Sequence, residues 1–300
     1  MVGRGKVTII GAGPAGIAAA IFLQRGGFDP LLLEMGIPGG LLRHADVVEN
    51  YPGFPRGVTG PQLAELFCSH LKEVGGVVTK ARVIGVKQGR EESFITSSSI
   101  GEFLSKAVIV ATGTKAKKVE MRGIQRNLGN RVFYDLYDLL AVSKMDEKIV
   151  VYGGGDAAFD QGINLSRRGY RVTVLCRSKS RCLPLLRERA EKNGLLVVEG
   201  RSIKKVEEGM EGVMLELGGD VAIDASRLLI ACGRESRLEL LDPSLRARIR
   251  FGNLPDTGIP GLYLAGDVVA DGKRQVGIAV GSGISAAMSA EFYLRGVTSE

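Results

Sequence analysis

The feature that most restricts the fold of this chain is a sequence pattern that occurs twice. In each copy an apolar strand runs into a glycine-rich turn, a helix and a second strand. A polar, alternating stretch then leads to a closing strand that ends in Ala-x-Gly. The glycine turns lie at residues 11–16 and 153–158, and the closing turns at 111–113 and 231–233. In the first copy the polar stretch is a meander from about 77 to 103 and the closing strand is 107–110, while the second copy begins with a strand at 148–152. A repeated unit of this length is far harder to obtain by chance than one glycine motif, so it predicts two domains of one plan.

Strands that alternate with helices predict an α/β fold with two Rossmann-like, three-layer dinucleotide-binding domains. After the second copy, from residue 262 onward, a strand, a turn and a small-residue helix read as a return to the first domain. The second domain is therefore expected to be an insertion. We expect residues 1–116 and 245–300 to form one domain and residues 117–244 to form the other.

The first glycine turn has the form Gly11-x-Gly13-x-x-Gly16. The first glycine allows the sharp turn from strand to helix, the second lets the backbone approach a pyrophosphate, and the third lets the helix pack on the strand. The phosphates then face free N–H groups at a helix N-terminus. Glu34 ends the next strand, where a carboxylate can accept hydrogen bonds from a ribose. These residues predict dinucleotide binding.

The second turn, Gly153-x-Gly155-x-x-Ala158, is the same device with alanine as the third small residue. The strand that follows it ends in a stretch with Arg177, Lys179 and Arg181 and no acidic residue. Cations attract the 2′-phosphate of NADPH, whereas a carboxylate would repel it. The stretch therefore favours NADPH over NADH, and a solvated basic loop is the alternative.

Composition excludes several classes of function. The net charge of +7 suits phosphorylated cofactors and acidic partners, but no nucleic-acid motif is present and the chain has no Trp. No apolar stretch is long enough to cross a membrane, so we expect a cytoplasmic protein. The four cysteines contain no Cys-x-x-Cys pair and there are only two histidines, which argues against a metal site or a disulfide framework.

Seven segments together point to a family. They are Gly-Ala-Gly-Pro-Ala-Gly at 11–16, Gly-Gly-Leu-Leu at 39–42, Val-Glu-Asn-Tyr-Pro-Gly-Phe at 48–54, Ala-Thr-Gly at 111–113, Gly-Gly-Gly-Asp-Ala-Ala at 153–158, Ala-Gly-Asp at 265–267 and Arg-Gln-Val at 274–276. With them the chain resembles, essentially end to end, the low-molecular-weight thioredoxin reductases among the pyridine nucleotide-disulfide oxidoreductases. The resemblance implies FAD in the first domain, NADPH or NADH in the second, and a homodimer.

The same resemblance implies roles for individual residues. Glu34 would hold the adenosine ribose and Asp267 the ribitol or pyrophosphate, while Asn50 and the Gly39-Gly40 loop would line the isoalloxazine. Backbone N–H groups at 275–276 would reach the flavin pyrimidine edge. The other positions expected to bind a cofactor are Gly11, Gly13, Pro14, Ala15, Gly16, Leu41, Ala111, Thr112, Gly113, Gly153, Gly155, Asp156, Ala157, Arg177, Lys179, Arg181, Gly266, Arg274, Gln275 and Val276.

One departure from the family bears directly on function. Thioredoxin reductases of this type carry a Cys-x-x-Cys pair, preceded by a Tyr, shortly before the second glycine turn. Here Asp135 and Asp138 occupy those positions. Disulfide exchange needs a thiolate, so these carboxylates cannot replace the dithiol. They either donate protons near the flavin or face solvent. A second departure is Cys-Arg-Ser at 176–178, where the family has His-Arg-Arg.

The sequence therefore predicts an FAD-dependent NAD(P)H oxidoreductase that passes electrons through flavin to an acceptor other than a dithiol protein. That acceptor would be an acidic electron carrier of the ferredoxin or flavodoxin type, or a small molecule. Five basic residues either dock such a carrier or form a solvated face: Lys115, Lys117, Lys118, Arg122 and Arg126. A thioredoxin-disulfide reductase with unconventional cysteines and a non-catalytic flavin-binding sensor remain as alternatives.

Overall fold

The computed structural model describes residues 3–4, 7–124, 128–210, 212–219, 221–251, 255–269 and 273–296. The chain forms two compact units. Unit 1 comprises Met1–Arg43, Val47–Lys115 and Glu235–Glu300, and unit 2 comprises His44–Asp46 and Ala116–Arg234. Residues 235–244, which the sequence analysis assigns to the inserted domain, pack in unit 1, where Leu241 joins the core.

Unit 1 is built on a five-stranded parallel sheet with the order β19-β8-β2-β3-β4. The strands are β2 (Val7–Ile10), β3 (Leu31–Glu34), β4 (Val78–Lys80), β8 (Ala107–Val110) and β19 (Leu262–Leu264). The two central strands, β2 and β8, are buried along their whole length, as expected for parallel strands covered on both faces.

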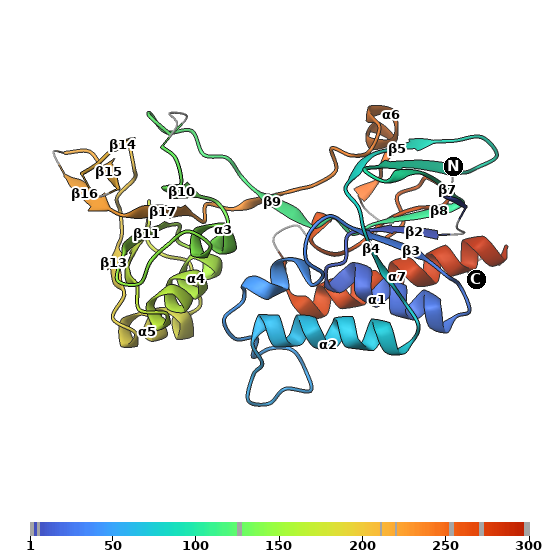
Figure 1. Cartoon of the computed structure of the whole chain (residues 1–300), viewed down its shortest axis with the longest axis horizontal. Helices are drawn as coiled ribbons and strands as arrows, with labels where there is room; N and C mark the ends of the chain where they lie inside the picture. The colour runs from blue at the N-terminus through green and yellow to red at the C-terminus, as the bar shows by residue number, and fades with distance from the viewer. Residues whose placement is uncertain are drawn as a thin grey trace. The chain divides into compact units, whose positions relative to one another are not determined.

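Helices cover one face of this sheet (Figure 1). They are α1 (Pro14–Arg25), α2 (Gly60–Glu73) and α7 (Val276–Arg295). Small residues let α1 and α7 approach each other closely: a Cβ atom at Gly283 would lie 2.1 Å from the Ala15 carbonyl oxygen. The apolar side chains of α1 and α7 form one core with alternate residues of β2 and β8.

An antiparallel layer covers the opposite face. It consists of β5 (Val83–Gln88), β6 (Phe94–Ser98) and β7 (Gly101–Ser105), with β1 (Gly3–Arg4) at its edge and the short helix α6 (Pro243–Arg248) nearby. Its side chains form a second core with the other face of the parallel strands. The predicted meander at 77–103 was wrong at its start, because residues 78–80 join the parallel sheet as its edge strand.

Unit 2 repeats this plan around a second five-stranded parallel sheet, with the order β10-β17-β11-β12-β13. The strands are β10 (Val132–Phe133), β11 (Lys148–Tyr152), β12 (Arg171–Leu175), β13 (Leu196–Val198) and β17 (Arg227–Ile230). As in unit 1, the closing strand of the copy, β17, pairs directly with the first one, β11. The predicted α/β fold with two Rossmann-like parallel sheets is confirmed.

The two faces of the second sheet also carry different layers. Helices α3 (Leu136–Leu140), α4 (Asp156–Arg167) and α5 (Pro184–Lys192) share one core with the sheet. The antiparallel strands β14 (Lys205–Glu208), β15 (Val213–Glu216) and β16 (Ala222–Ala225) share the other. Two further strands, β9 (Thr114–Ala116) and β18 (Arg234–Ser236), lie where the chain passes between the units and pair with each other.

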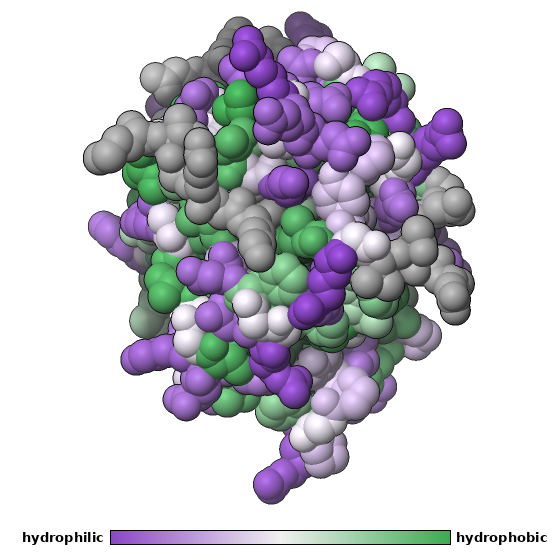
Figure 2. Space-filling view, turned by 90° about the vertical axis from the view of Figure 1, so that its right-hand side faces the viewer, coloured by the Kyte–Doolittle hydropathy of each residue, from purple (hydrophilic) through white to green (hydrophobic). Residues whose placement is uncertain are grey.

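The surface mixes polar and apolar side chains. Figure 2 shows hydrophobic residues between hydrophilic ones on one face of the molecule. Within the described part of the chain, no helix combines the length and the hydropathy needed to cross a bilayer.

Candidate functional site

The glycine turn of unit 1 lies at the carboxyl end of β2, the edge at which open parallel sheets bind ligands. Gly11 has φ +102°, and a Cβ atom there would lie 2.4 Å from the Ala111 carbonyl oxygen. A Cβ atom at Gly16 would lie 1.8 Å from the Gly11 carbonyl oxygen. Only glycine fits these two positions. At Gly13, in contrast, no atom of the described residues lies within 4 Å of the position that a Cβ atom would take. The backbone there is therefore open to a ligand.

Helix α1 begins at this turn without a polar cap. Gly13 is its N-cap residue, Pro14 is its first residue, and no described side chain caps it or places a negative charge in its first turn. Backbone N–H groups of the first turn, beginning at Ala15, have no partner within the helix. They are available to an anion, and the helix dipole favours one there.

A carboxylate lies beside the same turn. Glu34 ends β3, and its two oxygens accept hydrogen bonds from the N–H groups of Ala12 and Gly36, each at 2.7 Å. These bonds fix the carboxylate against the turn. Because each carboxylate oxygen has a second lone pair, Glu34 can still accept hydrogen bonds from ribose hydroxyls.

The Gly39-Gly40 loop packs directly on the turn. The N–H of Gly39 donates to the Ala12 carbonyl at 2.7 Å, and a Cβ atom at Gly40 would lie 3.3 Å from the Gly13 Cα. Both glycines have positive φ values, +107° and +54°. Leu41 follows in the short 3-10 helix η1 (Gly40–His44). The loop therefore forms a wall beside the open backbone at Gly13.

The closing turn at 111–113 supports the site from behind. The Ala111 N–H donates to the Ile10 carbonyl at 2.8 Å, and the Ala111 carbonyl is the group that requires glycine at position 11. The Thr112 hydroxyl donates to the Arg237 carbonyl at 2.7 Å, and the Arg237 N–H donates to the Gly113 carbonyl at 3.1 Å. These contacts hold the turn to the segment that follows β18.

Gly266 and Asp267 reach the same edge from the last strand of the sheet. Gly266 has φ +75°, and a Cβ atom there would lie 2.8 Å from the Ala15 Cβ. Its N–H donates to the Ser282 hydroxyl of α7 at 2.8 Å. Asp267 follows in the 3-10 helix η3 (Gly266–Val268) and is half-buried.

Asn50 and Gln275 come together from distant parts of the chain. The Asn50 amide nitrogen donates to the Gln275 side-chain oxygen at 2.8 Å. Gln275 follows Arg274 and is the N-cap residue of α7, but its side chain does not cap that helix. The hydrogen bond to Asn50 holds the Gln275 side-chain amide away from the start of α7. The N–H groups of the first turn, from Val276 onward, are therefore open to a ligand.

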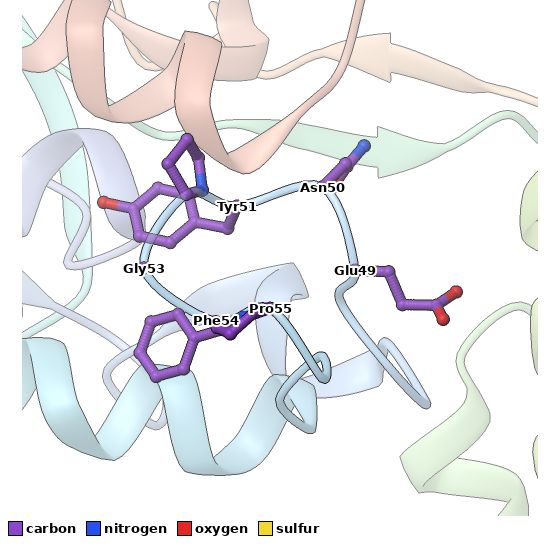
Figure 3. A pocket seen from close by; sticks show the side chains of 7 residues that line it. Glu49, Asn50, Tyr51, Gly53, Phe54 and Pro55 are labelled. Atoms are coloured by element: carbon purple, nitrogen blue, oxygen red, sulfur yellow. The ribbon is translucent and has the colours of Figure 1, made fainter.

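The loop that carries Asn50 is ordered by aromatic contacts. Residues 49–55 line an open hollow of about 320 Å³ (Figure 3). The Tyr51 ring lies 6.3 Å from the Phe54 ring and 5.7 Å from the Phe67 ring, measured between centroids. In Figure 3 the Tyr51 and Phe54 rings lie on one side of the loop and the Glu49 side chain on the other.

Taken as a set, the residues expected to bind FAD meet at one edge of the unit 1 sheet. They provide open glycine backbone where the phosphates are expected, a fixed carboxylate where the ribose is expected and two helix N-termini that no described side chain caps. This arrangement fits an elongated ligand with phosphates in its middle.

The glycine turn of unit 2 has the same geometry. A Cβ atom at Gly153 would lie 2.5 Å from the Ala231 carbonyl oxygen, just as a Cβ atom at Gly11 would lie close to the Ala111 carbonyl oxygen. Gly155 corresponds to Gly13. Among the described residues, no atom lies within 4 Å of its Cβ position and no side chain caps α4, which begins after it. The repeat in the sequence is therefore also a repeat of backbone environments.

The basic loop after β12 packs on this turn. The Arg181 N–H donates to the Gly154 carbonyl at 2.7 Å, and the Leu183 N–H donates to the Asp156 carboxylate at 2.8 Å. Asp156 and Ala157 belong to the first turn of α4. The side chains of Arg177, Lys179 and Arg181 are exposed, and no described residue forms an ion pair with them.

The structure adds a carboxylate that the sequence analysis missed. Glu199, directly after β13, accepts hydrogen bonds from the Ser180 N–H at 2.9 Å and from the Arg187 guanidinium at 2.8 Å. Hydrogen bonds from Ser180 and Arg187 lower the pKa of Glu199 to about 2. Its position at the end of the strand beside β12 is the signal that could have identified it.

Asp135 has a structural role in unit 2. It is the N-cap residue of α3, and its carboxylate accepts hydrogen bonds from the N–H groups of Tyr137 at 2.8 Å and Asp138 at 3.4 Å. Asp138 is exposed in the first turn of that helix. Negative charge at this end suits the helix dipole, so both carboxylates stabilise the start of α3.

The cysteines do not form a dithiol site. All four described thiols are free and none lies in a close pair. The Cys176 thiol donates to the Gly153 carbonyl and the Cys232 thiol to the Tyr152 carbonyl, each at 3.3 Å. Burial raises the pKa of both thiols to about 11 and also raises the pKa of Cys68 and Cys182. Thiols with such pKa values are weak nucleophiles at neutral pH.

The five basic residues considered for docking have different surroundings: Lys115 is ion-paired, whereas Lys117, Lys118 and Arg122 are exposed. Lys115 pairs with Glu239 at 3.2 Å and with Glu235 at 3.5 Å. The backbone carbonyl of Arg122 accepts a hydrogen bond from the N–H of Val206 in β14. Lys117 and Lys118 lie in the segment that follows β9, and Arg126 lies outside the described residues.

Comparisons with known proteins agree along nearly the whole chain. A sequence model of the family described as pyridine nucleotide-disulphide oxidoreductase matches residues 5–283. The chain is 31% identical to a thioredoxin reductase of Listeria innocua and 32% identical to one of Bacillus subtilis. These alignments cover 96% of this chain and 93% and 94% of the two relatives. A crystal structure of Lactococcus lactis thioredoxin reductase matches with a TM-score of 0.86 at 26% identity, covering 98% of this chain and 100% of that one.

Proposed function

Because the chain belongs to the pyridine nucleotide-disulphide oxidoreductase family, as a low-molecular-weight thioredoxin reductase-like flavoprotein, we propose that it carries electrons from NADPH to an acceptor other than a dithiol protein. It is an FAD-dependent oxidoreductase of this family. The observation that carries the proposal is the pair Asp135 and Asp138, which stand where the family's reactive dithiol is expected and are engaged at the start of α3.

The edge of the unit 1 sheet is the proposed FAD site. Gly13 and the first turn of α1 receive the pyrophosphate, Glu34 receives the adenosine ribose, and Asp267 receives the ribitol or pyrophosphate side. Asn50 and the start of α7 face the isoalloxazine. When bound, FAD supplies the ring that accepts a hydride. The N-terminus of α7 can stabilise negative charge on that ring because its N–H groups and dipole are fixed before the reaction.

The corresponding edge of unit 2 is the proposed NADPH site. Gly155 and the first turn of α4 receive the pyrophosphate, and the exposed cations Arg177, Lys179 and Arg181 receive the 2′-phosphate. An arginine about 4 Å from a phosphate contributes roughly 1–4 kcal/mol, depending on the local dielectric. At about 1.4 kcal/mol per factor of ten, this corresponds to a preference for NADPH over NADH of about 5- to 700-fold.

The cysteines support an acceptor other than a protein disulfide. Cys176 and Cys232 are tied to backbone carbonyls and have pKa values of about 11, so neither provides a thiolate at neutral pH. The net charge of +7 favours an acidic acceptor such as a ferredoxin or flavodoxin, and a small molecule is the other class.

We also propose that the protein is a homodimer, as the family resemblance implies. Ile284, Met288 and Phe292 recur every four residues on α7 and are between 36% and 41% exposed. Residues four apart lie on the same side of a helix, so these three form an apolar stripe suited to burial against a second copy.

The decisive experiment is anaerobic reduction of the purified flavoprotein by NADPH, followed by a panel of acceptors. Bleaching of the flavin absorbance, then rapid reoxidation by ferredoxin, flavodoxin, a quinone or oxygen but not by thioredoxin, is the expected result. Prior alkylation of the cysteines should leave these rates unchanged. Reoxidation by thioredoxin that is lost after alkylation would contradict the proposal, and a flavin that NADPH cannot reduce would indicate a non-catalytic flavin protein.

A further inference from the structure

The basic loop after β12 starts alongside the neighbouring strand β13. The two strands pair in parallel, with Leu175 opposite Val198. The pairing continues past the end of both strands: the Cys176 N–H donates to the Val198 carbonyl at 2.7 Å, and the Arg201 N–H donates to the Cys176 carbonyl at 3.1 Å. Glu199 lies within this continuation, so its backbone is fixed relative to the start of the loop.

The Glu199 carboxylate ties the middle of the loop down. One of its oxygens accepts from the Ser180 N–H at 2.9 Å and from the Arg187 guanidinium at 2.8 Å, and the same guanidinium nitrogen donates to the Ser180 hydroxyl at 3.3 Å. Bonds between an ionised carboxylate and N–H donors are among the stronger hydrogen bonds in proteins. Ser180 is thereby held through both its backbone and its side chain.

The far end of the loop is anchored to other elements. The Arg181 N–H donates to the Gly154 carbonyl of the glycine turn at 2.7 Å, and the Leu183 N–H donates to the Asp156 carboxylate in α4 at 2.8 Å. Three N–H groups within four residues are thus bound to three different elements. The backbone is fixed while the side chains of Arg177, Lys179 and Arg181 stay exposed.

Arg187 is not itself free to bind a phosphate. Its guanidinium donates to Glu199 at 2.8 Å and to Glu191 at 2.8 Å. Two carboxylates therefore balance its charge, and it in turn balances the charge of Glu199. A carboxylate beside a phosphate site would ordinarily repel the ligand. Here the Arg187 guanidinium offsets one of the two negative charges of Glu199 and Glu191, which reduces that repulsion.

We propose that Glu199, together with Arg187, is a positioning residue for recognition of the 2′-phosphate of NADPH. It holds residues 177–181 in the conformation that presents Arg177, Lys179 and Arg181 to that phosphate. This inference rests on the proposed use of NADPH. It adds a specificity-determining carboxylate from a strand that lies outside the sequence motif.

The test measures binding to the FAD-loaded protein without turnover. The probes are adenosine 2′,5′-bisphosphate and adenosine 5′-monophosphate, which differ in the 2′-phosphate, and affinities are measured by isothermal titration calorimetry. Glu199→Gln should weaken binding of the bisphosphate by about tenfold or more, because a charge-assisted bond to the loop is lost. Binding of the monophosphate should change by less than about twofold, since its phosphate site at the glycine turn is untouched.

Two further variants isolate the role of the loop. Glu191→Gln removes the other carboxylate partner of Arg187 without contact to the loop, so both probes should bind as in the unaltered protein. Ser180→Gly loosens the loop without changing a charge and should reproduce the selective loss. Amide hydrogen exchange of residues 177–183 should accelerate in Glu199→Gln and Ser180→Gly but not in Glu191→Gln.

The outcomes separate this inference from the proposed function. If the unaltered protein binds both probes equally, the NADPH preference fails and this inference fails with it. If it prefers the bisphosphate and Glu199→Gln keeps that preference, only the role of Glu199 is overturned. The role of Glu199 is also overturned if Glu199→Gln loses affinity for both probes equally. The same holds if Glu191→Gln loses as much affinity for the bisphosphate as Glu199→Gln does.

Discussion

Single residues at the carboxyl ends of the strands determine the backbone shape of each glycine turn. Gly11 and Gly153 are pressed against the carbonyls of Ala111 and Ala231, whereas Gly13 and Gly155 are open. A side chain at the first pair would displace the closing turn, and a side chain at the second would fill the space that a phosphate needs. The first glycine of each turn and the glycine two residues later are therefore required for different reasons.

The thiols of Cys176 and Cys232 should react slowly at neutral pH and faster as the pH rises. Burial favours the neutral thiol and raises both pKa values to about 11, so ionisation requires the pH to approach 11. Well below a pKa, the thiolate fraction grows about tenfold per pH unit. Cys232 is exposed as a whole residue, although its sulfur atom is partly desolvated beside the Tyr152 carbonyl. Its labelling by iodoacetamide should accordingly rise about tenfold per unit between pH 7 and 10, measured by peptide mass spectrometry. A plateau below pH 9 would show an activated thiol and revive a disulfide-exchange mechanism.

At the scale of secondary-structure elements, unit 1 depends on the close approach of α1 and α7. Helix α7 begins beside the proposed flavin site and crosses α1 where Gly283 meets the Ala15 carbonyl. This contact joins the two helices whose N-termini belong to the proposed FAD site. A change in the angle at which the two helices cross would therefore move the helix N-termini at the proposed site as well as the side chains in the core.

Gly283→Ala and Gly281→Ala should have opposite effects on stability. A Cβ atom at Gly283 would lie 2.1 Å from a backbone oxygen, so α7 must shift and the free energy of unfolding should fall by about 1–3 kcal/mol. At Gly281 no described atom lies within 4 Å, and alanine should stabilise the helix by about 0.5–1 kcal/mol. Thermal denaturation followed by circular dichroism gives both values. Equal shifts for the two variants would contradict the packing of α7 on α1.

The sequence predicts these elements well because their signals are local. Apolar runs and glycine turns mark the core strands, and the predicted strand at 107–110 and the one at 148–152 match β8 and β11. The sequence says less about pairing between distant segments. Residues 78–80 were assigned to the meander because a three-residue strand carries no pattern that distinguishes a parallel edge from a hairpin. Glu199 was missed because its partners, Ser180 and Arg187, become neighbours only when β13 pairs with β12.

On the scale of the whole molecule, the chain contains two units that each have their own cores. Unit 1 has one core on each face of its parallel sheet, and so does unit 2. Elements with separate cores can open separately, with different free energies. Because the cores are separate, we expect a destabilising substitution in one unit to leave the local stability of the other unit unchanged.

The Arg227–Glu147 pair provides the test, because it lies wholly within unit 2. The guanidinium of Arg227 on β17 donates to both oxygens of Glu147 at 2.6 and 3.0 Å, and also to the Val142 carbonyl at 2.9 Å. Its side chain is 14% exposed and that of Glu147 is 19% exposed. Glu147→Gln leaves a largely buried charge without its counterion, which should lower the stability of unit 2 by about 2–3 kcal/mol after allowance for partial exposure.

Hydrogen exchange resolved by peptide is the measurement that distinguishes the units. In Glu147→Gln the amides of β11 and β17 should exchange roughly 30- to 150-fold faster, as a loss of about 2–3 kcal/mol implies. The amides of β2 and β8 should keep their rates. Glu188→Gln is the matched control, since it breaks the exposed pair with Lys192 on α5 and should change stability by less than about 0.5 kcal/mol. Faster exchange in β2 and β8 as well would mean that the two units unfold as one, and that a nucleotide bound to unit 2 also stabilises unit 1.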